Sequence, residues 1–140
     1  MAENKKVMVS GCFDLLHSGH VRFLEIAGSY GDLYVAVGSD KNIMLLKGKS
    51  PVFNEKERVY MVKSLKFVKN AFIPSGNGGL DFLPELKRMH PEIFIVNEDG
   101  DSEEKRRACE DLGMEYIVLK RTPLDNLPER SSTNLKKGLS

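Results

Sequence analysis

The sequence has few cysteines, almost no net charge and no long apolar run. Each of these features excludes a class of protein. Its two cysteines, Cys12 and Cys109, cannot build a disulfide framework and do not have the spacing of a zinc site. The 21 basic and 20 acidic residues leave a formal charge of +1, which argues against nonspecific binding to nucleic acid or to an anionic membrane. The sequence contains no stretch typical of a membrane span or of a signal peptide. We therefore predict a cytoplasmic protein that binds no nucleic acid and no membrane.

The order of apolar and polar residues predicts one α/β domain. The 140 residues contain no internal repeat, no low-complexity tract and no interdomain linker, so we expect a single domain over residues 1–140. Apolar runs that are typical of strands alternate with stretches of helical periodicity, and this alternation indicates βαβ units. The expected fold is a single Rossmann-like, doubly wound, five-stranded parallel sheet with helices on both faces.

The boundaries of the expected elements follow from periodicity, caps, glycines and prolines. The predicted strands are Lys6–Gly11, Leu33–Gly38, Asn70–Pro74, Glu92–Val96 and Glu115–Leu119. The predicted helices are His20–Gly28, a helix capped by Asn54, Asp81–His90, Ser102–Leu112 and Ser132–Leu139. The segment between the second strand and Asn54 is predicted to be a loop. The glycines of 76–79 lack the lysine and hydroxyl of a P-loop and are predicted to form a flexible turn.

The segment Gly11-Cys12-Phe13-Asp14-Leu15-Leu16-His17-Ser18-Gly19-His20 stands where the first strand passes into the first helix. A helix start offers unpaired backbone N–H groups and the positive end of the helix dipole, so it favours anions. His17 and His20 are three residues apart and therefore fall on one helical face, where both can donate to the same oxyanion. The segment therefore predicts a phosphate-binding site.

Two further polar clusters follow strands of the predicted sheet. Asn97 and Glu98 come directly after the fourth strand, and Lys120-Arg121-Thr122 follows the fifth. Ligands of open α/β sheets bind beyond the carboxyl ends of the strands, so we expect these clusters to lie on the same edge as the histidine pair. Asn97 and Glu98 are candidates for contact with a substrate or a base, although the alternative is that they only terminate a strand.

The first motif resembles the GxFDxxHxGH motif of the cytidylyltransferase-like nucleotidyltransferases, and every defining position of that motif is present. The resemblance extends along the whole chain. The segment from Ser39-Asp40 to Leu46-Lys47-Gly48 is similar to the lysine-bearing loop of the family, and Asn54–Arg58 is similar to its arginine-bearing helix. Arg121-Thr122 together with Ser131-Ser132-Thr133 resembles its RTxGxSTT element.

The resemblance implies attack by a substrate phosphate oxygen on the α-phosphorus of a nucleoside triphosphate, with release of pyrophosphate. Catalysis would consist of positioning and charge stabilisation, without a covalent intermediate. The residues implied as catalytic are His17, His20, Lys47 and Arg58. Those implied as nucleotide-binding are Gly11, Cys12, Phe13, Gly19, Arg121, Thr122, Ser131, Ser132 and Thr133. Those expected to contact the acceptor are Asp14, Asp40, Lys49, Asn97 and Glu98.

The same resemblance implies the partners. Magnesium is expected to accompany the triphosphate, held mainly by phosphate and water oxygens, with no dedicated protein ligand set. The donor is CTP or ATP, with a slight preference for CTP from Arg121-Thr122. The alternative is an adenylyltransferase of the heptose-phosphate type that uses ATP, because the lysine-bearing loop resembles that branch most. The acceptor is a small phosphate monoester such as a polyol or sugar phosphate. A homodimer is expected because family members commonly pair.

Four alternatives stand beside this interpretation. Arg58 could be an exposed residue of a first helical turn, and Ser131–Thr133 could only cap a helix. Residues 123–128 lengthen the loop before the serine cluster beyond the family pattern, and Glu129-Arg130 replaces the expected residues. This departure supports the alternative of a nucleotide-binding module without turnover.

A fragment of a class I aminoacyl-tRNA synthetase is disfavoured because the chain is short, lacks the KMSKS motif and has no excess of basic residues for binding tRNA.

Overall fold

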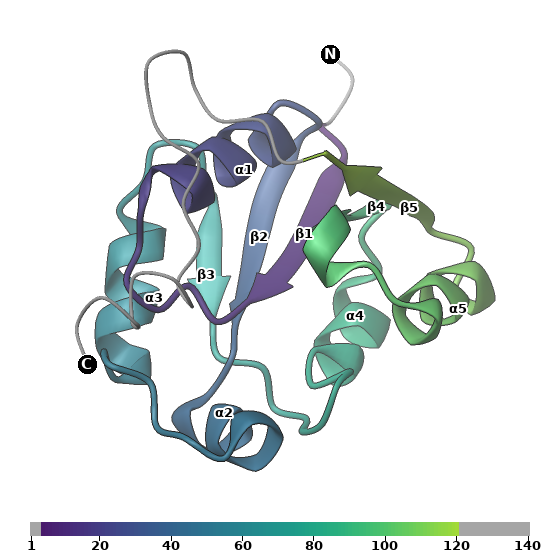
Figure 1. The fold of residues 1–140 in the computed structure, drawn as a ribbon. Coiled ribbons are helices and arrows are strands. Elements are labelled where there is room, and N and C mark those ends of the chain that lie inside the picture. Colours follow the sequence, from purple (N-terminus) through teal and green to yellow (C-terminus); the bar gives the residue numbers. More distant parts are fainter. Residues whose placement is uncertain (1–3, 121–140) are drawn as a thin grey trace.

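Five parallel strands form one sheet in the order β3-β2-β1-β4-β5 (Figure 1). The structure is a computed structural model and describes residues 4–120. The strands are β1 (Lys6–Gly11), β2 (Asp32–Val37), β3 (Asn70–Phe72), β4 (Ile93–Asn97) and β5 (Glu115–Leu119). The chain runs outward from β1 through β2 to β3 and then crosses back to β4, so the strand order reverses between β1 and β4. The predicted five-stranded, doubly wound parallel sheet is confirmed.

Helices cover both faces of this sheet, as predicted. On one face, α1 (Ser18–Gly28) and α3 (Glu55–Lys63) pack against side chains that include Val7 and Val9. On the other, α4 (Leu83–Met89) and α5 (Glu103–Asp111) pack against side chains that include Met8. Successive strand residues point to opposite faces, so a strand that is covered on both sides must be apolar throughout. Burial of the central strands on both sides therefore explains their nearly continuous apolar runs.

The region after β2 differs from the prediction. In place of a loop, residues Asp40–Lys47 form α2, which is capped at its start by Ser39 and at its end by Gly48 in a left-handed conformation. This helix lies at the carboxyl ends of the strands, as does the short 3-10 helix η1 (Glu98–Gly100) (Figure 1). Only Asn42 and Ile43 of α2 are buried. Because α2 has no apolar stripe facing a core, its sequence did not show the periodicity of a packed helix.

Other boundaries move by a few residues. The first helix begins at Ser18 rather than His20, β3 ends at Phe72, and α4 is shorter than the predicted helix 81–90. The turn 76–79 is more constrained than predicted, because the Asn42 side chain both donates to and accepts from the backbone of Gly78. The predicted helix Ser132–Leu139 lies outside the described residues. Among the described residues, no helix has the length and apolar character needed to cross a membrane.

Candidate active site

The two histidines of the first motif organise the start of α1. His17 is the N-cap residue, and its Nδ1 accepts the backbone N–H of Gly19 at 3.0 Å. The backbone N–H of His17 donates in turn to Nδ1 of His20 at 3.3 Å. This reciprocal arrangement has the geometry of a capping box, with imidazoles in place of the usual hydroxyl and carboxylate. The imidazole rings stack with centroids 3.8 Å apart and planes 20° apart.

These hydrogen bonds determine where each imidazole carries its hydrogen. A ring nitrogen that accepts an N–H must present its lone pair, so Nδ1 of His17 and Nδ1 of His20 both act as acceptors. The neutral rings therefore carry their hydrogen on Nε2, which makes Nε2 the donor. No acidic residue stands in the first turn of α1 to neutralise the positive end of the helix dipole. The start of α1 thus combines two stacked donors with a backbone end that favours anions.

The glycine and the aromatic residue of the motif hold His20 in place. A Cβ atom on Gly11 would lie 2.9 Å from Cε2 of Phe13, so the Phe13 ring requires a glycine here. The buried Phe13 ring also meets the edge of the His20 ring, with a centroid distance of 5.4 Å. Phe13 and Leu15 both have positive φ angles, near 52° and 53°, which are uncommon for residues with side chains. The loop between β1 and α1 is therefore a strained segment that packing keeps in one conformation.

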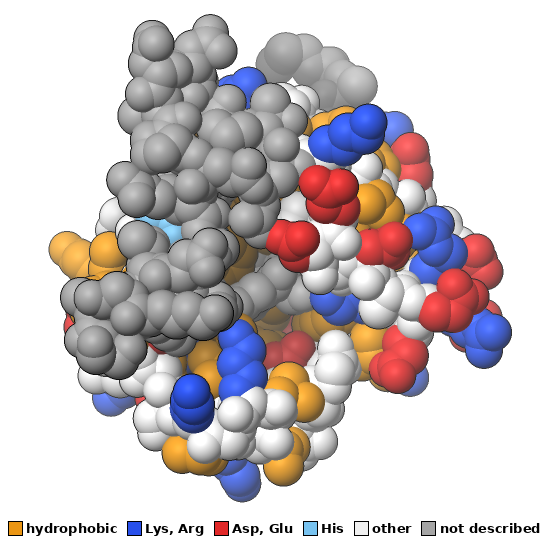
Figure 2. Space-filling model, viewed as in Figure 1, with side chains coloured by type: hydrophobic (Ala, Val, Ile, Leu, Met, Phe, Trp, Pro, Cys, Tyr) orange, Lys and Arg blue, Asp and Glu red, His pale blue; other side chains and the backbone are white. Residues whose placement is uncertain are grey.

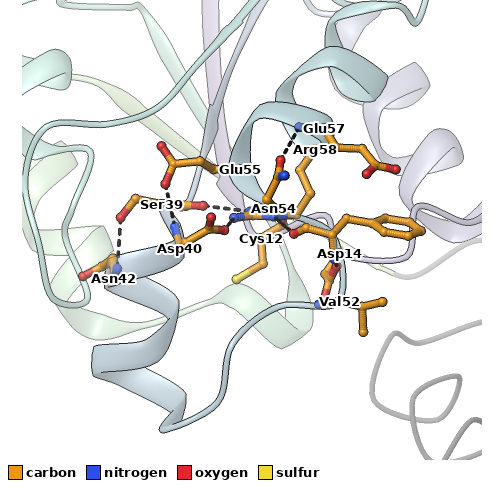
Figure 3. A network of polar contacts seen from close by, with 12 residues as sticks. Cys12, Asp14, Ser39, Asp40, Asn42, Val52, Asn54, Glu55, Glu57 and Arg58 are labelled. Carbon is orange, nitrogen blue, oxygen red and sulfur yellow. Dashed lines mark hydrogen bonds and ion pairs between the residues drawn. The ribbon is translucent and has the colours of Figure 1, made fainter.

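The carboxylate of the motif fixes a second loop rather than standing open to a ligand. Asp14 is 2% exposed, and its two oxygens accept the backbone N–H groups of Val52 and Phe53 at 2.7 and 2.9 Å (Figure 3). These contacts attach the segment between α2 and α3 to the histidine motif. Asp14 therefore has a structural role, and its expected contact with the acceptor remains a prediction.

Arg58 also differs from its predicted role. Its guanidinium is fully buried and donates to four groups, of which three are backbone oxygens and one is the Asp40 carboxylate (Figure 3). The backbone acceptors are the carbonyls of Cys12, Gly38 and Phe53, at 2.7 to 2.9 Å. Arg58 therefore joins the ends of β1 and β2 to the segment before α3. Because its guanidinium is buried and bonded to protein groups, Arg58 acts neither as a phosphate clamp nor as an exposed residue of the first helical turn.

Asp40 and the two candidate lysines lie on and after α2. Asp40 forms an ion pair with Arg58 at 2.7 Å, and its backbone N–H donates to the Glu55 carboxylate at 2.9 Å. Lys47 is the last residue of α2, not a loop residue as predicted, and Lys49 follows two positions later. Both lysines are exposed. Because Asp14 binds the segment that follows them, they remain candidates for contact with a phosphate near the histidines.

The clusters that follow the later strands are only partly described. Asn97 caps η1, where its side-chain oxygen accepts the N–H of Gly100 at 2.9 Å, and Glu98 is the first residue of η1. Both lie at the expected edge of the sheet, and their contact with a substrate remains a prediction. Five predicted nucleotide-binding residues lie outside the described residues, namely Arg121, Thr122, Ser131, Ser132 and Thr133.

The structure adds a partly buried polar cluster, of which the sequence motifs singled out only Cys12. It consists of Asn42 on α2, Asp81 just before α4, Lys105 on α5 and Cys12 after β1. Asn42 donates to the Asp81 carboxylate at 3.2 Å, and burial raises the pKa of Asp81. Burial also lowers the pKa of Lys105, although nearby Asp81 opposes this effect. The sequence offered no signal for this cluster because its members come from four separate segments.

No residue cluster suited to a metal ion is present between residues 4 and 120. Within that range, no three histidine, cysteine, aspartate or glutamate side chains gather closely enough to hold a cation. The described donors are imidazole N–H groups, ammonium groups and backbone N–H groups, which suit phosphate oxygens rather than a cation.

Comparison with known proteins identifies the family. The model of the cytidylyltransferase-like family matches residues 8–138, which is nearly the whole chain. The chain belongs to the cytidylyltransferase-like family. This confirms the resemblance inferred from the first motif and, with it, the nucleotidyltransferase class. A solved structure of a lipopolysaccharide core biosynthesis protein from Thermoplasma volcanium aligns with a TM-score of 0.70 and 26% identity, covering 87% of this chain and 99% of that one.

Curated members of this cytidylyltransferase-like family include enzymes of different names. A protein named FAD synthase from Methanopyrus kandleri is 38% identical over 133 residues, covering 87% of this chain and 86% of that protein. The bifunctional protein HldE from Aliarcobacter butzleri is 35% identical over 118 residues, which cover 83% of this chain and 24% of that protein. The family is therefore clear, while the names of these relatives differ.

Proposed function

We propose that this protein transfers the AMP group of ATP to a phosphate monoester. An oxygen of the monoester attacks the α-phosphorus of ATP, the bond from that phosphorus to the bridging oxygen breaks, and pyrophosphate leaves. The product carries a new pyrophosphate linkage between the acceptor and adenosine. The acceptor phosphate is already an anion, so the reaction needs no protein nucleophile. Its barrier falls through positioning of the two anions and stabilisation of negative charge.

The stacked histidine pair at the start of α1 is the observation that carries this proposal. Accepting N–H groups on Nδ1 makes the Nε2–H of His17 and of His20 the donors. Two such donors beside a helix N-terminus suit the oxygens of a triphosphate, where negative charge grows as the bond to pyrophosphate breaks. Lys47 and Lys49 supply cationic charge for the acceptor phosphate and offset its repulsion by the α-phosphate. Gly11, Cys12, Phe13 and Gly19 shape the phosphate-binding loop.

The relatives favour ATP over CTP as the donor. FAD consists of FMN joined to an adenylyl group, so a protein named FAD synthase forms a linkage of the proposed kind. The slight preference for CTP rested on Arg121 and Thr122, and both lie outside the described residues. FMN is the first acceptor to test, followed by polyol and sugar phosphates. Magnesium would be held by triphosphate and water oxygens, because the described residues provide no carboxylate cluster for it.

The decisive experiment measures pyrophosphate release in the presence of magnesium. ATP and CTP are each offered with FMN, glycerol 3-phosphate, ribitol 5-phosphate and a heptose phosphate, and products are identified by mass spectrometry. The proposal predicts an adenylylated product from one acceptor. Exclusive use of CTP would overturn the donor assignment. Tight nucleotide binding by calorimetry without turnover on any acceptor would favour a nucleotide-binding module instead.

The single domain, the homodimer and the cytoplasmic location remain predictions. Light scattering coupled to size-exclusion chromatography measures the molar mass directly. A mass near twice the 15.7 kDa of the chain is expected, whereas a mass near that of one chain would contradict the homodimer.

A further inference from the structure

A carboxylate and an ammonium group face the carboxyl ends of the central strands without pairing with each other. Asp81 and Lys105 lie close enough to affect each other electrostatically, yet they form none of the ion pairs found between residues 4 and 120. Two opposite charges that are partly removed from water normally pair directly, because burial without a partner is costly. Neither group therefore satisfies the hydrogen-bonding capacity of the other.

The cluster stands at the point where the strand order reverses. A Cβ atom on Gly38, which follows β2, would lie 3.9 Å from both Oδ2 of Asp81 and Sγ of Cys12. The Nζ atom of Lys105 donates to the carbonyl of Gly100, at the end of η1, at 2.8 Å. The cluster thus touches the segments that follow β2, β1 and β4. Figure 2 shows the surface hollowed between α2 and η1, with charged side chains of both signs in the hollow. Ligands of open α/β sheets bind at such a reversal.

The Asp81 side chain is held in a fixed orientation. It is 9% exposed and accepts from Nδ2 of Asn42 at 3.2 Å. Asn42 is itself oriented by Gly78, whose N–H donates to the Asn42 Oδ1 at 2.7 Å and whose carbonyl accepts from Nδ2 at 3.2 Å. Both the oxygen and the nitrogen of the Asn42 amide are therefore held by Gly78. The Asp81 carboxylate has further acceptor positions besides the one that Asn42 uses.

Lys105 supplies hydrogen-bond donors where Asp81 supplies acceptors. An ammonium group has three donors and no acceptor, and the carbonyl of Gly100 uses one of the three. A ligand that lies between Lys105 and Asp81 must therefore accept from one side and donate to the other. A hydroxyl group does both with a single oxygen, whereas an apolar ring does neither and would leave two polar groups without partners.

We propose that Asp81 and Lys105 recognise the hydroxyl-bearing carbon chain of the phosphorylated acceptor. This inference rests on the proposed function, since it assigns the part of the acceptor beyond its phosphate. The acceptor class is a polyol phosphate, which includes both a free polyol phosphate and the ribityl phosphate chain of FMN. The acceptor phosphate then points toward the start of α1, and the hydroxyls lie over the end of β4.

The test compares acceptors with and without hydroxyls. Pyrophosphate release from ATP is measured with glycerol 3-phosphate, ribitol 5-phosphate, FMN and n-propyl phosphate, which has no hydroxyl. The wild-type protein is expected to prefer its best polyol acceptor over n-propyl phosphate by about 100-fold or more in kcat/KM. Asp81→Asn and Lys105→Met are each expected to reduce this preference at least tenfold without changing the KM for ATP. Asp111→Asn and Lys87→Met change exposed residues of the same two types and should leave the preference intact.

The outcomes separate this inference from the proposed function. If FMN is the best acceptor, the hydroxyls that Asp81 and Lys105 recognise belong to a ribityl chain. If glycerol 3-phosphate or ribitol 5-phosphate is the best acceptor, they belong to a free polyol phosphate. A preference that is unchanged in both variants overturns the role of Asp81 and Lys105 while leaving the nucleotidyltransferase reaction intact. If the wild-type protein turns over no acceptor, the proposed reaction fails instead. Calorimetry with ribitol 5-phosphate and n-propyl phosphate then tests recognition alone, and equal affinities for the two would refute it.

Discussion

At the scale of single residues, the first motif combines structural and chemical duties in the same side chains. His17 caps α1 through Nδ1 and presents Nε2–H as a donor, while His20 closes the capping box and stacks on His17. Gly11 has ordinary backbone angles but allows the Phe13 ring to lie over it. Gly11, His17 and His20 therefore each have a physical reason within the chain, besides any contact with a ligand.

Replacing Gly11 by alanine tests the packing behind His20. The new Cβ atom would lie 2.9 Å from the Phe13 ring, which must then move and carry the edge contact with His20 away. We expect a loss of about 1–3 kcal/mol in the free energy of unfolding, from overpacking. Turnover should fall at least tenfold. Urea denaturation and pyrophosphate release provide the two measurements.

Gly79→Ala is the matched control for this substitution. A Cβ atom on Gly79 would meet only the end of the Glu104 side chain, at 3.7 Å, so stability and turnover should stay near the wild-type values. If Gly11→Ala behaves like Gly79→Ala, then Phe13 does not position His20.

Sequence patterns single out the histidine pair but not the buried residues that support the loops around it. The histidine pair was identified because its spacing and its place after a strand carry a chemical meaning. The resemblance implies a catalytic Arg58, and a helical arginine near a binding site gives no sign of burial in the sequence. Its four hydrogen bonds join segments that are up to 46 positions apart in the chain. Only the folded structure brings those acceptors together.

At the scale of elements, α2, α3 and the segment between them form a unit that Arg58 attaches to the sheet. The loop after β1, the end of β2 and the start of α2 all meet its guanidinium. Asp14 adds two hydrogen bonds from the motif to the segment before α3. The position of the segment that carries Lys47 and Lys49 therefore depends on these buried polar contacts.

Substitution of Arg58 by methionine tests this arrangement. The change keeps a long apolar stem but removes every donor, so three backbone carbonyls and the Asp40 carboxylate lose their partner. Breaking a buried ion pair by removing one partner costs about 3–5 kcal/mol, and we expect a destabilisation of that order in urea denaturation. Calorimetry should show weaker binding of ATP as well.

Lys56→Met, on the exposed surface of the same helix, should change the free energy of unfolding by less than about 0.5 kcal/mol. Equal stability of the Arg58 and Lys56 variants would show that the buried network does not hold α3 to the sheet.

The missed helix α2 shows a limit of pattern reasoning at this scale. Three consecutive apolar residues, Met44, Leu45 and Leu46, are exposed, and a polar residue, Asn42, is buried. This arrangement reverses the usual amphipathic pattern of a surface helix. The capping residues Ser39 and Gly48 were the only local signals of the boundaries.

At the scale of the whole molecule, two apolar layers enclose the sheet and set its stability. The layer under α4 and α5 contains the thiol of Cys109, which is 1% exposed. Alternating apolar runs sufficed to predict the fold because both faces of a parallel sheet are covered. The order of the strands and the exact contacts between helices depend on side-chain packing that no local pattern records.

The buried thiol predicts a loss of stability at alkaline pH. Burial raises the pKa of Cys109 from 9.0 to about 11, so the folded protein keeps the thiol neutral where the unfolded chain would ionise it. Unfolding then releases a proton, and the free energy of unfolding falls as the pH rises from about 9 to 11. The contribution is about 3 kcal/mol and is fully present below pH 9.

Urea denaturation of the wild type and of Cys109→Ala at pH 8 and pH 10.5 measures this contribution. The wild type should lose more stability between the two pH values than the variant does. Equal losses would show that Cys109 does not ionise differently in the two states.

The central claim is that the Nε2–H groups of the histidine pair stabilise the triphosphate as pyrophosphate leaves, and His17→Asn tests it most directly. Asparagine is a good N-cap residue, so it keeps the contact with Gly19 while removing the imidazole donor. His17→Ala removes both and should lose about 1 kcal/mol of stability.

The measurement is kcat for pyrophosphate release from ATP with the best acceptor, at equal folded protein. We expect His17→Asn to unfold at the same urea concentration as the wild type but to have a kcat about 100- to 1,000-fold lower. A His17→Asn protein that keeps its wild-type kcat would contradict the account.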